Sequence, residues 1–248
     1  MQHTDQQKQT AAAWAAEIET RLQARPDSKV ETVRTLRREF SKRLSHEEPE
    51  MIIEVALLLI ASDDIAHRLF AYELVASHKA ALRSLGEREL EQLGSGINSW
   101  EDVDTFACSL SGQVWRAGQV PDALTERWAQ SPDRWWRRAA LVSTVPLNNR
   151  AQGGKGDTPR TIQICRLLAA DRDDMVYKAL SWALRQLVIH DAQAVRDFLQ
   201  EQQGVLAPRV VREVQNKLAT GLKNPRKKAL TTDFKADYDS ISYRNRKA

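Results

Sequence analysis

The stretch KVETVRTLRREFSKRL (residues 29–44) carries its apolar side chains three or four positions apart. These side chains are Val30, Val33, Leu36, Phe40 and Leu44. Residues at this spacing share one face of an α-helix. The stretch therefore predicts an amphipathic helix whose apolar side packs against the rest of the protein.

Most of the remaining sequence is also typical of helices. We expect them over residues 11–24, 51–62, 65–78, 100–115, 121–129, 132–147, 158–170, 175–189, 192–202 and 209–220. Asn98 or Ser99 is the expected N-cap of the fourth of these, and Ser131 that of the helix starting at Pro132. No segment alternates between apolar and polar residues as a strand does. Ten glycines and eight prolines among 248 residues are too few for the turns of a β-sandwich or barrel.

The expected helices are short and come in consecutive pairs. Five helix–loop–helix units cover residues 48–79, 83–116, 121–149, 157–190 and 191–221. Their lengths approach those of HEAT and tetratricopeptide units, but no tetratricopeptide consensus occurs. The sequence thus predicts an all-α protein, a curved α-solenoid of HEAT-like helix pairs (an α-α superhelix) forming one domain over residues 1–221. A plain orthogonal helical bundle is the alternative.

The positive charge is concentrated at the C-terminal end of the chain. Residues 209–248 hold eleven Lys or Arg against four Asp or Glu, a balance of +7, although the whole chain carries only +4. Such an end favours a polyanionic partner, most often nucleic acid. The alternative is a solvated tail without a partner. We expect residues 222–248 to form a basic, flexible tail.

Several kinds of chemistry have no support in the sequence. Two cysteines and five scattered histidines form no metal-ligand or nucleophile motif, so we expect neither a metal nor a cofactor. The N-terminus does not resemble a signal peptide, and the longest apolar run, residues 55–61, is too short to span a membrane. A cytoplasmic location is expected. The glycine-rich stretch NNRAQGGKGDT (148–158) lacks the order of a phosphate-binding loop and is interpreted as a flexible connection.

Three groups of aromatic and charged residues repeat at helical spacing on the second helix of successive pairs. The groups are Trp100 with Asp104, Trp135 with Arg138, and Lys178 with Trp182 and Arg185. Equivalent helices of a solenoid stack side by side, so these side chains are expected to meet on one concave wall. A carboxylate there would repel phosphate, which indicates work on a positive centre. The alternatives are tryptophans that fill the core, and an Asp104 that forms an ordinary salt bridge or interacts with the helix dipole in the first turn.

Four segments resemble the AlkD-type DNA alkylation repair glycosylases, whose fold is a curved stack of HEAT-like repeats. They are NSWEDVDTFA (98–107), RWWRRAALV (134–142), MVYKALSWALRQL (175–187) and APRVVREVQNKL (207–218). The helix HRLFAYELVASHK (67–79) is also similar to an early helix of that family. The resemblance covers roughly residues 30–220. Its most specific parts are the W-x3-D pattern at 100–104 and the K-A-x-x-W-x-L-R pattern at 178–185.

The resemblance implies an enzyme that removes cationic N3- or N7-alkylpurines from double-stranded DNA by hydrolysing the N-glycosidic bond. It implies a catalytic group made of Asp104 as the carboxylate and Trp100 and Trp182 as the tryptophans around the lesion nucleotide. Arg138 matches the arginine that contacts the backbone near the lesion. The neighbouring cations Arg134, Arg137, Lys178 and Arg185 are the other expected DNA-binding residues. The expected partner is alkylated duplex DNA, bound by a monomer without membrane or metal.

Two alternatives remain at this point. A HEAT-like protein could bind damaged or branched DNA without cutting it, or the solenoid could serve as a protein–protein scaffold. A pure binder has little use for the carboxylate of Asp104, and a scaffold would lack a basic concave face.

Overall fold

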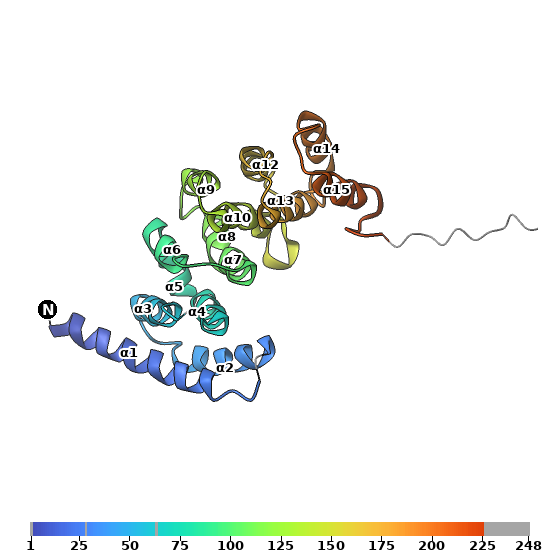
Figure 1. Cartoon of the computed structure of the whole chain (residues 1–248). Coiled ribbons are helices and arrows are strands. Elements are labelled where there is room, and N and C mark those ends of the chain that lie inside the picture. The colour runs from blue at the N-terminus through green and yellow to red at the C-terminus, as the bar shows by residue number, and fades with distance from the viewer. Residues whose placement is uncertain (1, 28, 63, 226–248) are drawn as a thin grey trace, which may run out of the picture.

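The computed structural model describes residues 2–27, 29–62 and 64–225, and every regular element of this part is helical. The predicted all-α class is therefore confirmed (Figure 1). The first half contains α1 (Gln2–Gln23), α2 (Val30–Arg43), α3 (Pro49–Ile60), α4 (Ile65–Ser77), α5 (Lys79–Ser84), α6 (Glu87–Leu93), α7 (Trp100–Phe106), η1 (Ala107–Ser111) and α8 (Gly112–Arg116). The second half contains α9 (Asp122–Ala129), α10 (Arg134–Ser143), α11 (Val145–Asn148), η2 (Arg150–Gln152), α12 (Thr158–Leu167), α13 (Asp174–Leu187), α14 (Ala192–Glu201) and α15 (Pro208–Thr220).

The helices follow one another as pairs along a curved array (Figure 1). Within the pairs, α3 packs on α4, α9 on α10 and α12 on α13. Each second helix also contacts the second helix of the next pair, in the order α4, α7, α10, α13 and α15. This neighbour-to-neighbour stacking is the arrangement of a solenoid. The predicted α-solenoid of helical repeats is confirmed over the alternative of an orthogonal bundle.

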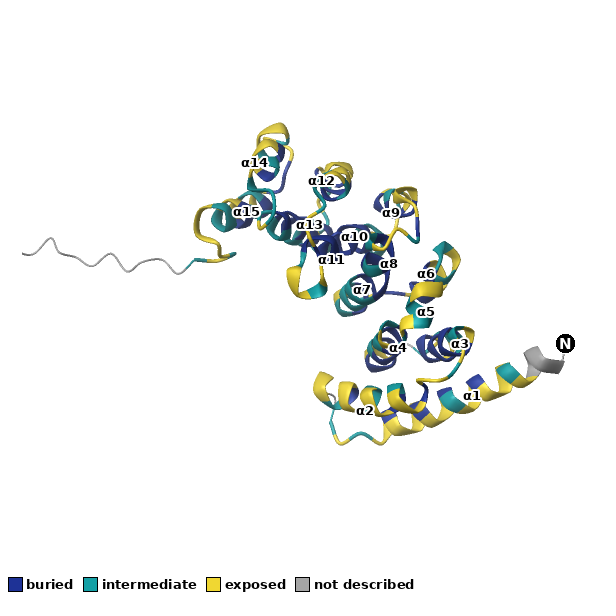
Figure 2. Ribbon diagram, turned by 180° about the vertical axis from the view of Figure 1, so that it is seen from behind, coloured by how far each residue is buried: buried dark blue, intermediate teal, exposed yellow. Residues whose placement is uncertain are grey.

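The apolar face predicted for the stretch 29–44 packs as expected over most of its length. Val33, Phe40 and Leu44 are buried, while Val30 in the first helical turn is half exposed. Figure 2 shows the same division along the array, with buried positions where helices meet and exposed ones on the outer faces. Burial of each fully enclosed apolar side chain contributes about 1.5–3 kcal/mol to folding.

Four aromatic rings link successive repeats through the core. Tyr72 lies 5.7 Å from Phe106, which lies 6.0 Å from Trp128, and Trp128 lies 4.9 Å from Trp136, measured between ring centroids. The rings come from α4, α7, α9 and α10. Tilted aromatic pairs at these separations add about 0.5–1.5 kcal/mol each beyond their buried area. They fix the positions of the helices that later carry the candidate site.

The start and end of α10 differ from the sequence prediction. Asp133, not Ser131, is the N-cap, because its Oδ1 accepts the Trp135 backbone N–H at 2.8 Å. The helix ends at Ser143 instead of continuing through Pro146. A proline inside a helix lacks the N–H donor and clashes with the preceding turn. Pro146 therefore begins a new short helix, α11, at the second position.

Helices α5 and α6 lie between residues 79 and 93, where no helix bounds were predicted although the unit 83–116 required a first helix there, and α1 begins nine residues before the predicted start at residue 11. Both short helices have polar, charged sequences without a long apolar stripe. Short helices of this kind are held by tertiary contacts more than by their own propensity. The helical periodicity of the sequence is therefore weak in α5 and α6, which were not predicted as separate helices.

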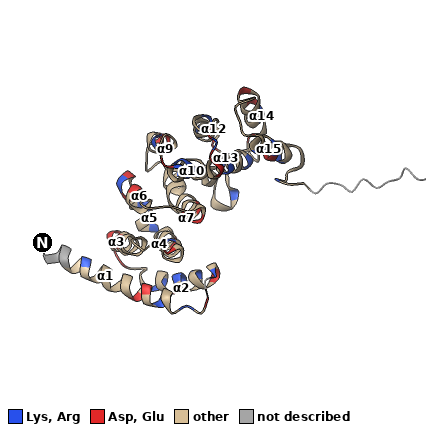
Figure 3. Cartoon of the chain, in the orientation of Figure 1, with Lys and Arg blue, Asp and Glu red and all other residues tan. Residues whose placement is uncertain are grey.

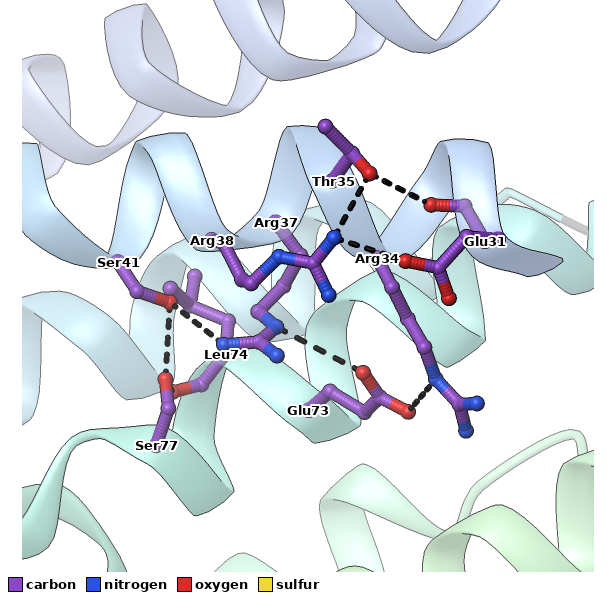
Figure 4. Close-up of polar contacts among 9 residues, drawn as sticks. All are labelled: Glu31, Arg34, Thr35, Arg37, Arg38, Ser41, Glu73, Leu74 and Ser77. Carbon is purple, nitrogen blue, oxygen red and sulfur yellow. Dashed lines mark hydrogen bonds and ion pairs between the residues drawn. The ribbon is translucent and has the colours of Figure 1, made fainter.

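The first repeats are joined by a polar contact between α2 and α4 (Figure 4). Glu73 on α4 accepts a 2.8 Å hydrogen bond from Arg34 Nε and lies 3.6 Å from Arg37 Nε. One turn further along α4, Ser77 Oγ lies 2.9 Å from Ser41 Oγ. These contacts fix the rotation of α2 against the solenoid beside the buried face of Phe40.

The glycine-rich loop 148–158 is tied to the helices around it. Asn148 Oδ1 accepts the Asp157 backbone N–H at 3.0 Å, and His190 Nε2 lies 2.7 Å from the Asn148 carbonyl oxygen. Arg116 also donates to the carbonyl oxygen of Gln152. The expectation of a flexible connection overlooked these anchors, because two of them join residues that are 36 and 42 positions apart in the sequence.

The expected basic tail, residues 222–248, lies mostly outside the described residues, which end at residue 225. Within the described part, no helix combines the length and apolar character needed to cross a lipid bilayer.

A π-helical turn, η1, interrupts the helix that runs from α7 to α8. The turn adds one residue, which rotates the following side chains by about 100° relative to an uninterrupted α-helix. Ser111 then reaches Ser143 on α10, with 2.7 Å between the two buried Oγ atoms. Gly112 packs so closely that a Cβ would lie 2.7 Å from the Ser143 carbonyl oxygen and 2.9 Å from that of Ala107.

We expect Gly112→Ala to lower the free energy of unfolding by about 1–3 kcal/mol, because the new methyl group meets backbone atoms that cannot move aside. Urea denaturation measures the change. Gly118→Ala gives the cost of backbone strain without a clash for comparison: its positive φ of 72° costs about 1–2 kcal/mol, and nothing lies within 4 Å of the new Cβ. A Gly112→Ala protein as stable as the wild type would show that η1 and α10 are not packed as described.

Candidate functional site

A pocket of about 430 Å3 opens where α7, α10, α13, the first turn of α15 and the segment after α15 come together. Six residues singled out from the sequence line it: Trp100, Asp104, Arg138, Lys178, Trp182 and Arg185. Helix α7 contacts α10, and α10 contacts α13, so three successive second helices supply these side chains. The stacking of equivalent helices brings together residues that lie up to 85 positions apart in the sequence.

Helix α7 supplies one tryptophan and the single pocket carboxylate on the same face. Its N-cap is Ser99, as predicted, because Ser99 Oγ accepts the Asp102 backbone N–H at 3.1 Å. The helix starts at Trp100, whose indole is half exposed, and Asp104 follows one turn later. A serine cap contributes about 1 kcal/mol to helix stability. The cap therefore fixes the helix end on which both side chains depend.

Asp104 and Arg138 form a two-pronged ion pair across α7 and α10. Arg138 Nε donates to Asp104 Oδ1 and Nη2 donates to Oδ2, both at 2.9 Å. The Arg138 side chain is almost fully buried, and 19% of the Asp104 side chain remains exposed. Parallel N–H···O bonds of this kind are strong and set the orientation of both groups. The carboxylate is therefore held rigidly at the edge of the pocket.

Arg138 also donates from Nη1 to the Met175 carbonyl oxygen at the start of α13. A single guanidinium thus joins three successive repeats. The resemblance implied that Arg138 contacts a backbone phosphate. In the structure, three of its five N–H groups are engaged inside the protein. Two of these three donate to Asp104.

Burial raises the pKa of Asp104 above the ordinary value of an aspartate, and the hydrogen bonds and charge of Arg138 oppose that shift. The neighbouring thiol of Cys108 is affected more strongly. Burial, with a smaller effect of the Asp104 charge, raises the pKa of Cys108 to about 12. The thiol is therefore uncharged near neutral pH and offers no nucleophile. Asp104 is left as the only acid–base group with suitable chemistry on this wall among the described residues.

Helix α13 supplies the opposite wall through Lys178, Trp182 and Arg185, one turn apart. Lys178 is in close contact with the Asp174 carboxylate. Trp182 is half-buried and packs against the core. Arg185 Nε donates to Ser181 Oγ at 3.2 Å. Burial lowers the pKa of Arg185 from its ordinary value, with the charge of Glu213 opposing the shift.

The arginines Arg134 and Arg137 do not line this pocket. Arg137 Nε donates to Asp171 Oδ2 at 2.7 Å, and its Nη1 donates to two carbonyl oxygens before α10. Arg134 lies over the Trp135 ring at 4.7 Å and 3.6 Å from Asp173. Arg137 is thus engaged in joining the α10 and α13 repeats, whereas Arg134 remains half exposed outside the pocket.

Three pocket residues were missed by the sequence analysis: Met175, Arg209 and Lys223. Met175 contributes through its backbone carbonyl, which no side-chain pattern indicates. Arg209 stands four positions before Glu213, a spacing that reads as an ordinary surface pair on a helix. Lys223 follows the end of α15, and only the direction of the chain after that helix brings it to the pocket.

The charge of the pocket differs from that of the rest of the surface. Charges of both signs occur along the whole array (Figure 3). The lining, in contrast, holds five cations and the carboxylate of Asp104. Within the part of the chain that the structure describes, no three His, Cys, Asp or Glu side chains are placed to hold a metal ion. The five cations suit a polyanionic ligand, and the carboxylate of Asp104 suits a part of that ligand that becomes positive during a reaction.

A comparison with protein-family models gives a family for most of the chain. A family model described as DNA alkylation repair enzyme matches residues 28–218. A comparison with curated proteins finds no match. The matched segment contains α2 to α15 almost completely, and with them every pocket residue except Lys223.

We expect Arg138→Met to destabilise the protein by about 3–5 kcal/mol at neutral pH, because it leaves a half-buried carboxylate without its partner. The pKa of Asp104 then rises further above its unfolded value. The folded state binds the extra proton, so the loss of stability should shrink as the pH falls through that raised pKa. Urea denaturation of both proteins at several pH values measures this.

The double variant Arg138→Met with Asp104→Asn is the control, since it has no carboxylate to protonate. Its stability relative to the wild type should depend on pH less steeply than that of Arg138→Met. An Arg138→Met protein with an unchanged, pH-independent stability would contradict the ion pair described here.

Proposed function

The chain belongs to the family of DNA alkylation repair enzymes, and from this membership we propose that it is a DNA glycosylase. Its substrate would be double-stranded DNA carrying a cationic N3- or N7-alkylpurine. The reaction is hydrolysis of the N-glycosidic bond, with the alkylated base and an abasic site as products. We further propose that the protein acts as a monomer without metal or cofactor.

The observation that supports this proposal is the position of Asp104. A carboxylate weakens the attraction of a pocket for phosphate, yet Asp104 stands in a lining of five cations and is held there by Arg138. Its burial raises its pKa, which makes its charge costly to keep in the folded protein. A charged group kept at such a cost is typical of a functional site.

The proposed reaction needs an ionised carboxylate more than it needs a general acid to protonate the leaving base. An alkylated purine already carries a positive charge, so it leaves with the electron pair of the glycosidic bond and becomes neutral. The sugar passes through a state with oxocarbenium character at C1′, as in other glycosyl transfers. Ionised Asp104 stabilises that positive charge and positions the attacking water. The water adds its oxygen to C1′, and its released proton goes to Asp104 or to solvent.

The two tryptophans would act on the same positive charge. Trp100 and Trp182 line the pocket from α7 and α13, on either side of the Asp104–Arg138 pair along the chain. The face of an indole attracts a cation by about 0.5–2 kcal/mol. We infer that the two rings pack against the sugar and backbone of the lesion nucleotide. Because the pocket is open, the base need not enter an enclosed cavity.

The cations of α13 would bind the DNA backbone. Lys178 and Arg185 stand one turn on either side of Trp182, so together they would reach the phosphates that flank a lesion nucleotide held at Trp182. Arginine can grip a phosphate with two parallel hydrogen bonds. Arg134 is half exposed outside the pocket, and we infer that it contacts the duplex farther along.

One observation favours a second candidate, a protein that binds damaged DNA without cutting it. Both oxygens of Asp104 already accept hydrogen bonds from Arg138. A purely structural ion pair would have the same geometry. The two candidates differ in whether the Asp104 charge is needed for the release of the base.

We expect Asp104→Asn to bind methylated duplex DNA almost as tightly as the wild type and to release the base at least about a hundredfold more slowly, because a neutral amide cannot stabilise the developing cation. The measurements are duplex binding by gel shift and the single-turnover release of 7-methylguanine or 3-methyladenine. Spontaneous depurination of the same DNA is subtracted.

Glu101→Gln is the matched control: it makes the same chemical change three residues earlier on α7, and Glu101 does not line the pocket. Its release rate should stay close to that of the wild type. Unchanged release by Asp104→Asn would remove Asp104 as the catalytic carboxylate, and no release by the wild type would support the binding protein instead.

A further inference from the structure

We propose that Glu213, a buried carboxylate behind the pocket, holds Arg209 and Lys223 in place to bind a backbone phosphate. Glu213 is a positioning residue in this account, and the two cations touch the ligand. The proposal rests on the proposed function, since the phosphate belongs to the bound DNA. It adds to that function a phosphate site at the C-terminal end of the pocket.

Glu213 lies on the inner face of α15 and is only 2% exposed. Its Oε2 accepts a 2.7 Å hydrogen bond from Ser181 Oγ on α13, and its Oε1 accepts a 2.8 Å bond from Arg209 Nε. Burial alone would raise the pKa of Glu213, but the bonds from Ser181 and Arg209 lower it below the ordinary value. The side chain is therefore ionised at neutral pH and fixed by partners on two helices.

The chain after α15 turns back so that Lys223 reaches the same carboxylate. The helix ends at Thr220, and its C-cap Gly221 has a φ of +74°, the left-handed conformation that suits glycine. Asn216 Nδ2 then donates to the Lys223 carbonyl oxygen at 3.0 Å. Lys223 Nζ lies 3.6 Å from Glu213 Oε2. The turn is thus closed by the Asn216 side chain, and Lys223 Nζ lies beside the Glu213 carboxylate.

The resulting cluster has more positive than negative charge. Arg185 Nε lies 4.0 Å from the same Oε2, so three cations surround one buried carboxylate. Lys178, the remaining cation of this wall, has its own partner in Asp174. Two positive charges are therefore left without a counter-ion among the described residues. All three cations line the pocket, and a phosphate is the anion whose charge and oxygen atoms suit such a group.

The position of the cluster agrees with the engagement of Arg138. Arg138 spends three N–H groups on Asp104 and Met175. The cations around Glu213 stand at the other end of the same pocket and keep donors free, because Arg209 uses its Nε for Glu213 and leaves its terminal amino groups for a ligand. We infer that they bind the phosphate that sets the position of the strand relative to Asp104.

The direction in which Glu213→Gln changes the affinity for DNA separates a positioning role from a purely electrostatic effect. Glu213→Gln removes a negative charge beside the bound DNA, which by charge alone should tighten binding. If Glu213 positions the cations, the variant should instead bind duplex DNA more weakly. The slope of log K against log salt should fall by about one phosphate contact, that is by about 0.9. The single-turnover rate at saturating enzyme should change much less than the affinity, because Asp104 is untouched.

Two further variants keep the test decisive. Lys223→Gln, at a partly exposed site, should lower the affinity and the salt slope without changing the unfolding temperature. The same substitution in a Glu213→Gln background should have a smaller effect, because the positioning is already lost. Glu201→Gln is the matched control: its carboxylate pairs with Arg166 on the neighbouring repeat, away from the pocket, and should leave binding unchanged.

Tighter or unchanged binding by folded Glu213→Gln would overturn the proposal, as would a Lys223→Gln protein with a wild-type salt slope. Absence of duplex binding by the wild type would overturn it too. If the wild type binds the duplex with the expected dependence on Glu213 but releases no base, only the proposed glycosylase function fails.

Discussion

The bonds made by Arg138 hold the candidate site together. Its guanidinium donates two hydrogen bonds to Asp104 on α7 and one to the Met175 carbonyl at the start of α13, while Arg138 itself stands on α10. Three successive repeats thus meet at one side chain. An arginine is suited to this role because its donors lie in a rigid plane. The orientation of the planar Arg138 guanidinium group therefore determines where the Asp104 carboxylate lies in the pocket.

The pocket shows how a solenoid can place charge that a small compact core would exclude. Two carboxylates, the partly exposed Asp104 and the buried Glu213, lie at opposite ends, and each is paired with one or more cations from its own or a neighbouring element. Buried charges are tolerated only when paired and hydrogen-bonded. At one end Arg138 holds the Asp104 carboxylate toward the pocket. At the other end Glu213 lies behind the pocket, and its paired cations line it. The two ends suit the two parts of a damaged nucleotide, the positive base with its sugar and the negative backbone.

Local patterns predicted the parts of this protein that depend on helical spacing. Trp100 and Asp104 share a face because they are four residues apart, and the repeat spacing brings Arg138 and Trp182 to the same wall. The solenoid itself follows from the pairing of short amphipathic helices. The same reasoning missed the N-cap at Asp133, since Ser131 and Asp133 are equally good candidates from composition.

The features that could not be predicted depend on contacts distant in the sequence. Arg137 pairs with Asp171 outside the pocket, whereas the next residue, Arg138, pairs with Asp104 inside it. This difference depends on the rotation of α10 about its axis. That Lys223 reaches Glu213 depends on the turn after Gly221. The spacing of residues in the sequence predicts which of them share a helix face. The ion-pair partner of each charged side chain is defined only by the packing of the helices.

The most direct test of the central claim is to incubate the full chain with a duplex that contains one 7-methylguanine and to identify the products by mass spectrometry. The account predicts free 7-methylguanine and an otherwise intact strand with one abasic site, formed faster than by spontaneous depurination. DNA that is bound but chemically unchanged, or an altered base that stays attached to its sugar, would contradict it.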